Sequence, residues 1–289
     1  WTAAFDADIN VVSKPANAKR FGCYGVVADP LIVGNDVYVI DMKDKKSQYI
    51  KKYNLNSGKL LWTSPEIKEA RALPGLYYAD GTLILQIGGM IECQAYIYER
   101  QRQADGSYTI IERWLVYYRN VKPNGVQAFD ATNGAKLWDS ERFRKGITNG
   151  FVSGNNFIVC SGKALYSLDI KTGKEAYEVP LGPDDISDAQ KILDYKDRVI
   201  VIGEKGVSGH SKETGKLLNS GRWKSGDFAG MYGNTILFQR ENDDIAAYDA
   251  ETCKYKMYNA RKGSVSKLSE DGMYVYIWEK KTISKLSTQ

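Results

Sequence analysis

Six short runs of β-branched and aromatic residues recur along this chain, beginning at residues 37, 83, 157, 199, 236 and 274. After each of the first five runs comes a turn of the Asn-Ser-Gly, Thr-Asn-Gly or x-Thr-Gly type, with its glycine at position 58, 134, 173 or 215 and a cysteine at position 253. Most of the intervals are about 40 residues, a period typical of proteins built from four-stranded β blades. One interval is much longer, which indicates an insertion in a single repeat.

The repeats predict an all-β fold: a β-propeller of four-stranded blades, formed as a single domain over residues 1–289. We expect six blades, with seven as the alternative. Trp1 resembles Trp62 and Trp138, each of which stands four residues after a turn glycine. Residues 1–12 are therefore predicted to be the missing outer strand that closes the last blade. Trp62 and Trp138 are predicted to be wedges between neighbouring blades, because a buried indole removes a large apolar area from water.

The inserted segment covers residues 89–124, and a loop of that size is uncommon in a compact domain unless it has a function. Its sequence predicts a β-hairpin with a turn at Asp105-Gly106. Aromatic and arginine side chains of this type are enriched in binding hot spots. They are Tyr96, Tyr98, Arg100, Arg102, Arg113, Trp114, Tyr117 and Tyr118. Two interpretations remain open: a projecting arm that binds a partner, or a hairpin that folds back and buries its aromatic rings.

Lysine gathers in the loops expected between the second and third strands of the blades. These residues are Lys45, Lys46, Lys163, Lys205, Lys280 and Lys281. With a net charge of +5, such loops predict attraction of an anionic partner, because a charged surface steers complementary molecules. The alternative is that lysine at hairpin tips only keeps strand edges from pairing with other chains.

Two phrases carry a resemblance to a known family. They are Val126-Gln-Ala-Phe-Asp-Ala-Thr-Asn-Gly-Ala-Lys-Leu-Trp138 and Leu165-Tyr-Ser-Leu-Asp-Ile-Lys-Thr-Gly-Lys174. Both resemble the repeat of pyrroloquinoline-quinone-like β-propellers, a family that includes quinoprotein dehydrogenases and a non-catalytic lipoprotein of outer-membrane β-barrel assembly. The resemblance is to the non-catalytic branch, and it implies export to the periplasm or the cell surface.

Catalysis is not predicted. The quinoprotein branch uses adjacent cysteines and a calcium ion, whereas Cys23, Cys93, Cys160 and Cys253 are scattered through this chain. Three disulfide connectivities are open to four cysteines and the spacing favours none, so buried free thiols are expected. The single histidine, His210, falls on a predicted third strand and is expected to be structural. We therefore expect no catalytic residue, metal or cofactor, and keep a degenerate quinoprotein-like oxidoreductase as the alternative.

The predicted function is a non-enzymatic binding scaffold whose contact residues are the hairpin and loop side chains named above. The balance of 40 basic and 35 acidic residues disfavours nucleic acid, since phosphate-backbone binding needs a stronger basic excess. A protein or an anionic glycan is the expected partner. No apolar run is long enough to span a membrane, so a membrane attachment would come from a lipid anchor on the precursor.

Overall fold

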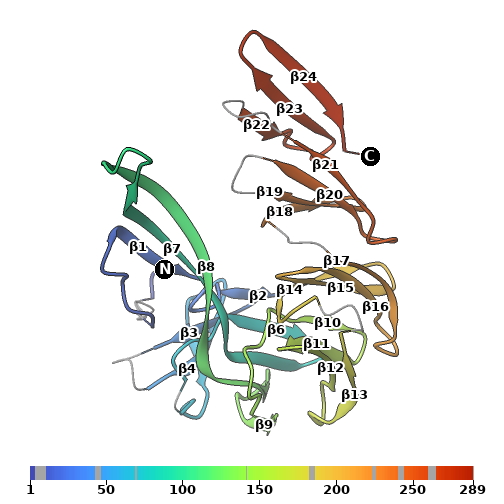
Figure 1. Cartoon of the computed structure of the whole chain (residues 1–289). Helices are drawn as coiled ribbons and strands as arrows, with labels where there is room; N and C mark the ends of the chain where they lie inside the picture. Colours follow the sequence, from blue (N-terminus) through green and yellow to red (C-terminus); the bar gives the residue numbers. More distant parts are fainter. Residues whose placement is uncertain are drawn as a thin grey trace. The chain divides into compact units, whose positions relative to one another are not determined.

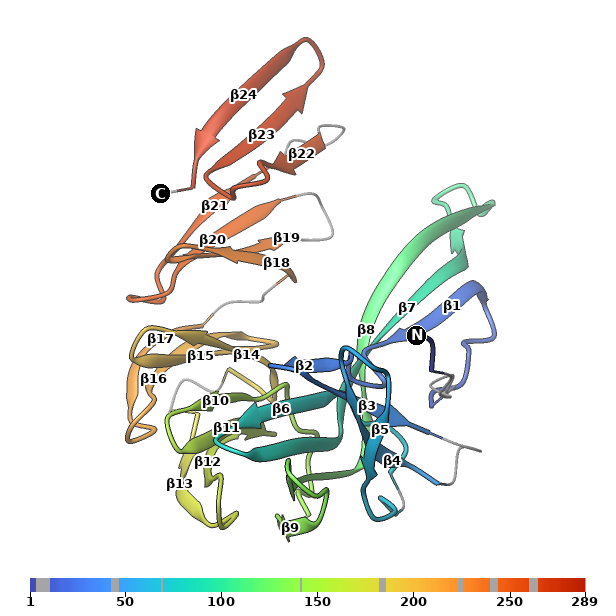
Figure 2. The same cartoon turned by 180° about the vertical axis from the view of Figure 1, so that it is seen from behind.

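The structure is a computed structural model that describes residues 1–3, 11–42, 47–68, 70–140, 142–181, 186–222, 226–239, 244–259 and 265–288. These residues form β-strands joined by turns, as Figures 1 and 2 show, and the chain is all-β as predicted. Its contacts divide it into two compact units. One comprises Trp1–Gly162 with Tyr166–Tyr177, and the other comprises Lys163–Leu165 with Glu178–Gln289. The single-domain organisation stays a prediction.

The strands form six antiparallel sheets, which we number as blades 1 to 6 in chain order. Blades 1 to 3 consist of the following strands: β2 (Leu31–Val33), β3 (Asp36–Asp41), β4 (Tyr49–Asn54) and β5 (Leu60–Thr63); β6 (Gly75–Ala79), β7 (Thr82–Arg102), β8 (Tyr108–Asp130) and β9 (Lys136–Asp139); β10 (Phe151–Ser153), β11 (Asn156–Ser161), β12 (Ala164–Asp169) and β13 (Glu175–Pro180). Blades 4 to 6 consist of these strands: β14 (Ala189–Tyr195), β15 (Arg198–Gly203), β16 (Gly206–Ser211) and β17 (Leu217–Arg222); β18 (Asp227–Tyr232), β19 (Thr235–Gln239), β20 (Ile245–Asp249) and β21 (Tyr255–Tyr258); β22 (Val265–Leu268), β23 (Tyr274–Glu279) and β24 (Thr282–Ser287).

The repeat reading of the sequence is confirmed strand by strand. Each of the six apolar runs lies in the second strand of its blade, and each glycine-type turn joins a third strand to a fourth. Among the described residues blade 6 has three strands, so the fourth strand predicted from residues 1–12 is not seen there. Residues 4–10 of that predicted strand lie outside the described residues. The first strand among the described residues, β1 (Ala18–Tyr24), pairs with β7.

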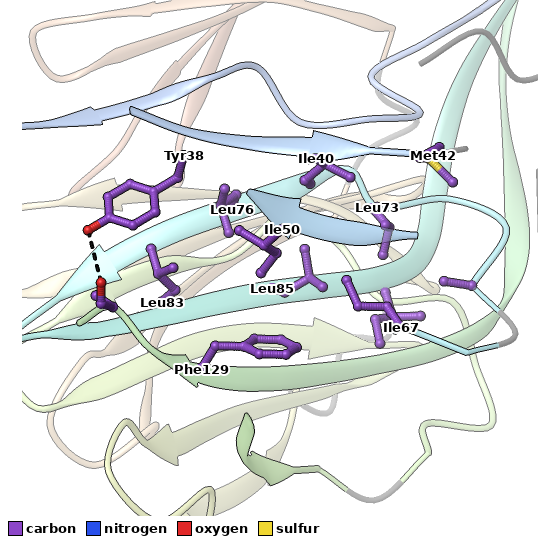
Figure 3. Close-up of a cluster of buried hydrophobic side chains, with 13 residues drawn as sticks. Tyr38, Ile40, Met42, Ile50, Ile67, Leu73, Leu76, Leu83, Leu85 and Phe129 are labelled. Atoms are coloured by element: carbon purple, nitrogen blue, oxygen red, sulfur yellow. Dashed lines mark hydrogen bonds between the residues drawn. The ribbon is translucent and has the colours of Figure 1, made fainter. Parts of the chain in front are cut away.

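Blades 1 and 2 meet across a shared apolar core, shown in Figure 3. Blade 1 contributes Tyr38, Ile40 and Ile50, and blade 2 contributes Leu83 and Leu85, all of them buried. The hydroxyl of Tyr38 also donates a hydrogen bond of 3.4 Å to the carbonyl oxygen of Ala131. Burial of apolar area of this kind is the main force that holds successive blades together.

The repeat tryptophans are the predicted wedges, and each lies over the turn glycine of the following blade. The indole nitrogen of Trp62 donates to the carbonyl oxygen of Ala131 at 3.3 Å, and that of Trp138 donates to Ile170 at 2.8 Å. A Cβ atom at Gly134 would lie 2.6 Å from the Trp62 ring. This turn therefore requires glycine for two reasons. Gly134 has a positive φ of 77°, and a larger residue would collide with the Trp62 ring above it.

Trp1 takes the corresponding place on blade 1, as its resemblance to the repeat tryptophans indicates. Its indole nitrogen donates to the carbonyl oxygen of Leu55 at 2.7 Å, and a Cβ at Gly58 would lie 2.4 Å from the ring. The ring also stacks on Tyr53 with centroids 6.2 Å apart. The N-terminus thus supplies blade 1 with the contact that Trp62 supplies to blade 2.

The surroundings of Cys253 explain why this turn has cysteine where the others have glycine. Cys253 keeps the left-handed backbone of the other turns, with a φ of 55°. The preceding blade has Asn219 in place of tryptophan, and the Asn219 side-chain amide donates to the carbonyl oxygen of Glu251 at 2.5 Å. Because Asn219 stands where an indole ring covers the other turns, a β-carbon has room there, and the buried thiol contacts the Asn219 carbonyl oxygen at 3.8 Å.

Candidate functional site

The inserted residues are continuous with two strands of blade 2. β7 and β8 pair from Thr82 opposite Asp130 to Arg102 opposite Tyr108, with one shift in register between Ile87 and Gly89. Figures 1 and 2 show the two long strands leaving blade 2 and ending in a hairpin tip, with β1 beside them. We call the part beyond the blade, residues 89–124 together with β1, the arm.

The base of the arm is a β-bulge at Gly88. The register shifts between Ile87 and Gly89, and both glycines have positive φ, 67° and 116°. A Cβ at Gly88 would lie 1.9 Å from the carbonyl oxygen of Pro123 on the opposite strand. Since bulges bend and twist a ribbon, these two glycines set the angle at which the arm leaves the blade.

The arm has three strands, of which the sequence predicted two. β1 lies antiparallel to β7, with Ala18 opposite Ile97 and Tyr24 opposite Glu92. The pairing contains a bulge between Ala18 and Arg20. An edge strand added in this way turns a two-stranded ribbon, which is marginally stable alone, into a small sheet.

Near the base of the arm, one face of this sheet, the odd face, is apolar and buried. Cys93, Ala95 and Ile97 alternate along β7 as buried residues, and Ala18 of β1 completes the cluster. Phe21, Leu115 and Tyr117 pack against these residues as partly buried neighbours. Alternation of this type is what a sheet with one buried face requires. The odd face therefore stabilises the arm.

The opposite face, the even face, carries the aromatic and charged side chains. Because opposite residues in the register share a face, these positions lie together: Arg20, Gly22 and Tyr24 of β1; Glu92, Gln94, Tyr96, Tyr98, Arg100 and Arg102 of β7; Tyr108, Ile110, Glu112, Trp114, Val116 and Tyr118 of β8. Several of the large side chains are exposed, with Trp114 at 54%, Tyr24 at 54% and Ile110 at 62%. A soluble protein that binds no partner rarely exposes so many large apolar side chains on one face of a sheet.

A polar network holds the middle of the even face. The ammonium group of Lys19 forms an ion pair with Glu112, and the Tyr96 hydroxyl donates to the other carboxylate oxygen at 2.9 Å. The hydrogen bonds from Lys19 and Tyr96 lower the pKa of Glu112, and the same bond to Glu112 raises the pKa of Tyr96. The Tyr96 ring contacts Trp114 with centroids 5.4 Å apart. Strands β1, β7 and β8 are thus joined by side chains as well as by their backbones.

The tip of the even face is cationic and aromatic. The guanidinium of Arg100 lies 4.7 Å from the centroid of the Tyr108 ring. Arg102 stands opposite Tyr108 in the register and is exposed. An open hollow of about 660 Å³ also lies at this end of the arm. It is lined by Tyr98 and Arg100 of the even face, by Asn17, and by the odd positions Glu99, Gln101 and Ile111. Cation–π contacts of this kind hold an arginine in place while leaving its N–H donors available.

The structure separates the predicted contact residues into groups. Tyr96, Tyr98, Arg100, Arg102, Trp114 and Tyr118 gather on the even face. Tyr117 lies on the odd face, where Arg119 stacks over its ring at 5.0 Å, and Arg113 has an odd register position. Arg20 and Tyr24 join the even face from β1, and the sequence analysis did not include them.

The predicted loop lysines occupy the turns between second and third strands. Lys163, Lys205, Lys280 and Lys281 are all exposed there, in blades 3, 4 and 6. Lys45 and Lys46 lie outside the described residues. A shared lysine-rich rim stays a prediction.

No cluster of three or more histidine, cysteine, aspartate or glutamate residues suited to a metal ion is found in the described part of the chain. Nor do the described residues include a helix that could cross a membrane.

A family model described as outer membrane protein assembly factor BamB matches residues 122–252, from the end of β8 through blades 3 and 4 into blade 5. Residues 122–252 belong to the pyrroloquinoline-quinone-like β-propeller repeat family. The family resemblance read from the two repeat phrases is therefore confirmed. The four-stranded blades described above are the units of this repeat.

Solved structures similar to the chain include other proteins with this architecture. BamB from Moraxella catarrhalis is 11% identical with a TM-score of 0.42, over 93% of this chain and 87% of that one. The computationally designed Ika8 protein is 16% identical with a TM-score of 0.44, over 90% and 83%. A europium-containing methanol dehydrogenase is 13% identical with a TM-score of 0.49, over 83% and 52%. No curated protein matches the chain. Likenesses at this distance do not assign an activity.

Proposed function

We propose that this chain is a non-enzymatic binding scaffold and that the even face of the arm is its contact surface for an acidic segment of a partner protein. The observation that carries the proposal is the separation of the two faces. The odd face buries Ala95 and Ile97 of β7 against Ala18 of β1, whereas the even face exposes Trp114, Tyr24 and Tyr98 beside arginines. Aromatic rings and arginine contribute most of the affinity in protein interfaces.

The charges of the even face favour an acidic partner. Glu112 is already engaged by Lys19, and Glu92 accepts a hydrogen bond of 2.7 Å from Gln94. The arginines Arg20, Arg100 and Arg102 are exposed on the same face. Arginine binds carboxylates with two parallel hydrogen bonds, so a carboxylate-rich segment complements this arrangement.

The description of the matched family as an outer membrane protein assembly factor supports a protein partner and a location in the periplasm or at the cell surface. The exposed lysines Lys163, Lys205, Lys280 and Lys281 would add long-range attraction for the same acidic partner. Lys45 and Lys46 belong to the same proposal. An anionic glycan is the competing occupant, which the experiment below separates from a protein.

The test is site-specific photo-crosslinking in the source cell. A photoreactive phenylalanine at Trp114 should give a discrete protein adduct, and the crosslinked partner peptide should be rich in aspartate or glutamate. The matched control is the same probe at Ile283, a strand residue of blade 6 that is 61% exposed. Equal adducts at both positions, or an adduct that a glycosidase removes, would contradict the proposal.

Charge reversal supplies a second, independent test of the proposal. The double variant R100E/R102E should weaken the Trp114 adduct at least tenfold, since it replaces attraction by repulsion at the tip. The variant K280E/K281E changes the charge by the same amount at a loop turn and should have a much smaller effect. A larger loss from the loop variant would place the contact surface on the loops and overturn the assignment to the arm.

A further inference from the structure

Two of the four cysteines face each other across the arm. Cys23 of β1 is directly opposite Cys93 of β7 in the register, and their sulfur atoms are 3.4 Å apart. Directly opposite residues of an antiparallel pair have Cα atoms roughly 4.5–5.5 Å apart, which lies within the range of about 4.4–6.8 Å that disulfides span. The backbone thus already has the spacing that a bond between the two sulfur atoms needs.

We propose that Cys23 and Cys93 are the site of a reversible disulfide that ties β1 to the arm. The spacing of the cysteines in the sequence favoured no connectivity, and the register selects this one. The other two cysteines, Cys160 in β11 and Cys253 in the blade 5 turn, are buried on different sheets. They serve as internal controls.

The exposure of the two thiols sets the order of the reaction. Cys93 is fully buried, and burial together with the hydrogen bond to Cys23 raises the pKa of its thiol to about 12. Cys23 is half-buried on the edge strand β1, so it is the more accessible of the two cysteines. Thiol–disulfide exchange requires both access and a thiolate, so Cys23 reacts first.

The oxidant is a small-molecule or protein disulfide. The Cys23 thiolate attacks one of its sulfur atoms, a mixed disulfide forms, and the other half leaves as a thiol after gaining a proton. The Cys93 sulfur then attacks the Cys23 sulfur, and the Cys93 proton passes to the second half, which leaves as a thiol. The two electrons from the cysteine pair reduce the oxidant disulfide, and one intramolecular disulfide replaces two thiols.

This bond would act on the even face through β1. Strand β1 carries Arg20 and Tyr24, and Lys19 beside them pairs with Glu112 of β8. Among the described strands, β1 pairs with β7 alone, along one edge. A covalent link to β7 would therefore restrict the local opening that removes these side chains from the face.

The test is oxidation of the folded protein with oxidised glutathione, followed by alkylation of the remaining thiols in denaturant and proteolysis. We expect the intact mass to fall by two hydrogen atoms, a linked pair of peptides containing Cys23 and Cys93, and alkyl groups on Cys160 and Cys253. Amides of β1 should exchange with deuterium at least tenfold more slowly in the oxidised protein. Alkylation of all four cysteines after oxidation would overturn the proposal.

Two single variants test the order of the reaction. Cys93→Ser leaves the accessible thiol without its partner, so glutathione should remain on Cys23 as a mixed disulfide. Cys23→Ser leaves a buried thiol, which should stay unmodified. Both variants should keep the circular dichroism spectrum of the reduced protein. Stable glutathione on Cys23 in the unaltered protein would show that Cys93 cannot complete the bond, and would contradict the assignment.

Discussion

The indole ring of Trp62 lies against Gly134 so closely that a β-carbon at that glycine would be 2.6 Å from the ring. The same arrangement joins Trp138 to Gly173 and Trp1 to Gly58. Each pair links a residue of one repeat to the turn of the next. The tryptophan of the repeat thus packs directly against the turn glycine of the next repeat.

Replacement of Gly134 by alanine should lower the free energy of unfolding by about 2–4 kcal/mol, because the left-handed backbone and displacement of the ring both cost energy. The matched control is Gly81→Ala. Gly81 has a similar φ of 75°, and a β-carbon there would contact nothing within 4 Å. It should lose only about 1–2 kcal/mol. Urea unfolding of both variants measures the difference, and equal losses would show that the ring contact is unimportant.

A carboxylate at the end of the third strand should stabilise the repeat turn in a pH-dependent way. Asp169 accepts hydrogen bonds from the Thr172 backbone and hydroxyl, at 2.8 and 2.7 Å, and these bonds lower its pKa. A lowered pKa in the folded state means that this contribution is present above the unfolded value of about 3.9 and is lost as the pH falls below it. Asp169→Ala should therefore cost about 1 kcal/mol at pH 7 and less at pH 3.

Asp169→Asn is the control for the turn, because blade 1 has asparagine at this position. There Asn54 accepts equivalent bonds from the Ser57 backbone and hydroxyl, at 2.9 and 3.0 Å. The asparagine variant should keep most of the stability and lose the pH dependence. Thermal unfolding of both variants at the two pH values distinguishes them. An alanine variant with the same deficit at both pH values would rule out a role for the charge.

The single histidine should make the protein less stable in mild acid. His210 lies on the third strand of blade 4, as predicted, with its ring nitrogens 3.0 Å from the Ser208 hydroxyl and from the Gly215 carbonyl oxygen. Burial lowers its pKa, although the hydrogen bond to Gly215 opposes the shift. The stabilising effect is therefore complete above the unfolded pKa of about 6.5 and is lost as the pH falls from there through the folded value.

Urea unfolding between pH 7 and pH 5 measures this effect, with a slope of at most about 1.4 kcal/mol per pH unit. His210→Gln removes the titrating group, and its stability should be flat over the same interval. Because the chain has only 1 histidine, a slope that persists in the variant would have to come from carboxylates.

The two faces of the arm should respond differently to the same substitution. Ala95→Asp places a carboxylate in the buried cluster with Ala18 and Ile97, where an unpaired charge costs several kcal/mol. Hydrogen exchange should then show that the amides of the arm lose protection while the blades keep theirs. Trp114→Asp, on the exposed face, should leave this protection unchanged. Equal loss in both variants would show that the odd face does not stabilise the arm.

The repeat could be read from the sequence because its information is local. Each second strand is a short apolar run, and each turn combines a hydrogen-bonding residue such as Asp169 with a glycine four residues later, or with Cys253 in the fifth repeat. The tryptophan contacts follow from the same spacing. Short-range signals of this type survive without knowledge of the tertiary structure.

The third strand of the arm could not be read in this way. β1 contains adjacent charges, Lys19 and Arg20, and a bulge that interrupts its alternation. Its partner on β7 is far away in the sequence, so neither pattern nor turn length indicates the pairing. The candidate aromatic residues were found, but their division between faces depends on the register: Tyr117 and Tyr118 are adjacent and therefore lie on opposite sides.

The paired length of β7 and β8 beyond Gly89 sets how far the tip of the arm lies from blade 2. Deleting two facing residue pairs between Gly89 and the tip would retract the contact surface by about 7 Å and keep the same side chains on the same side. Deleting one pair would shift the tip by only about 3.4 Å but turn its aromatic side chains to the opposite side. Homologues of this chain should therefore differ in arm length by even numbers of residues per strand.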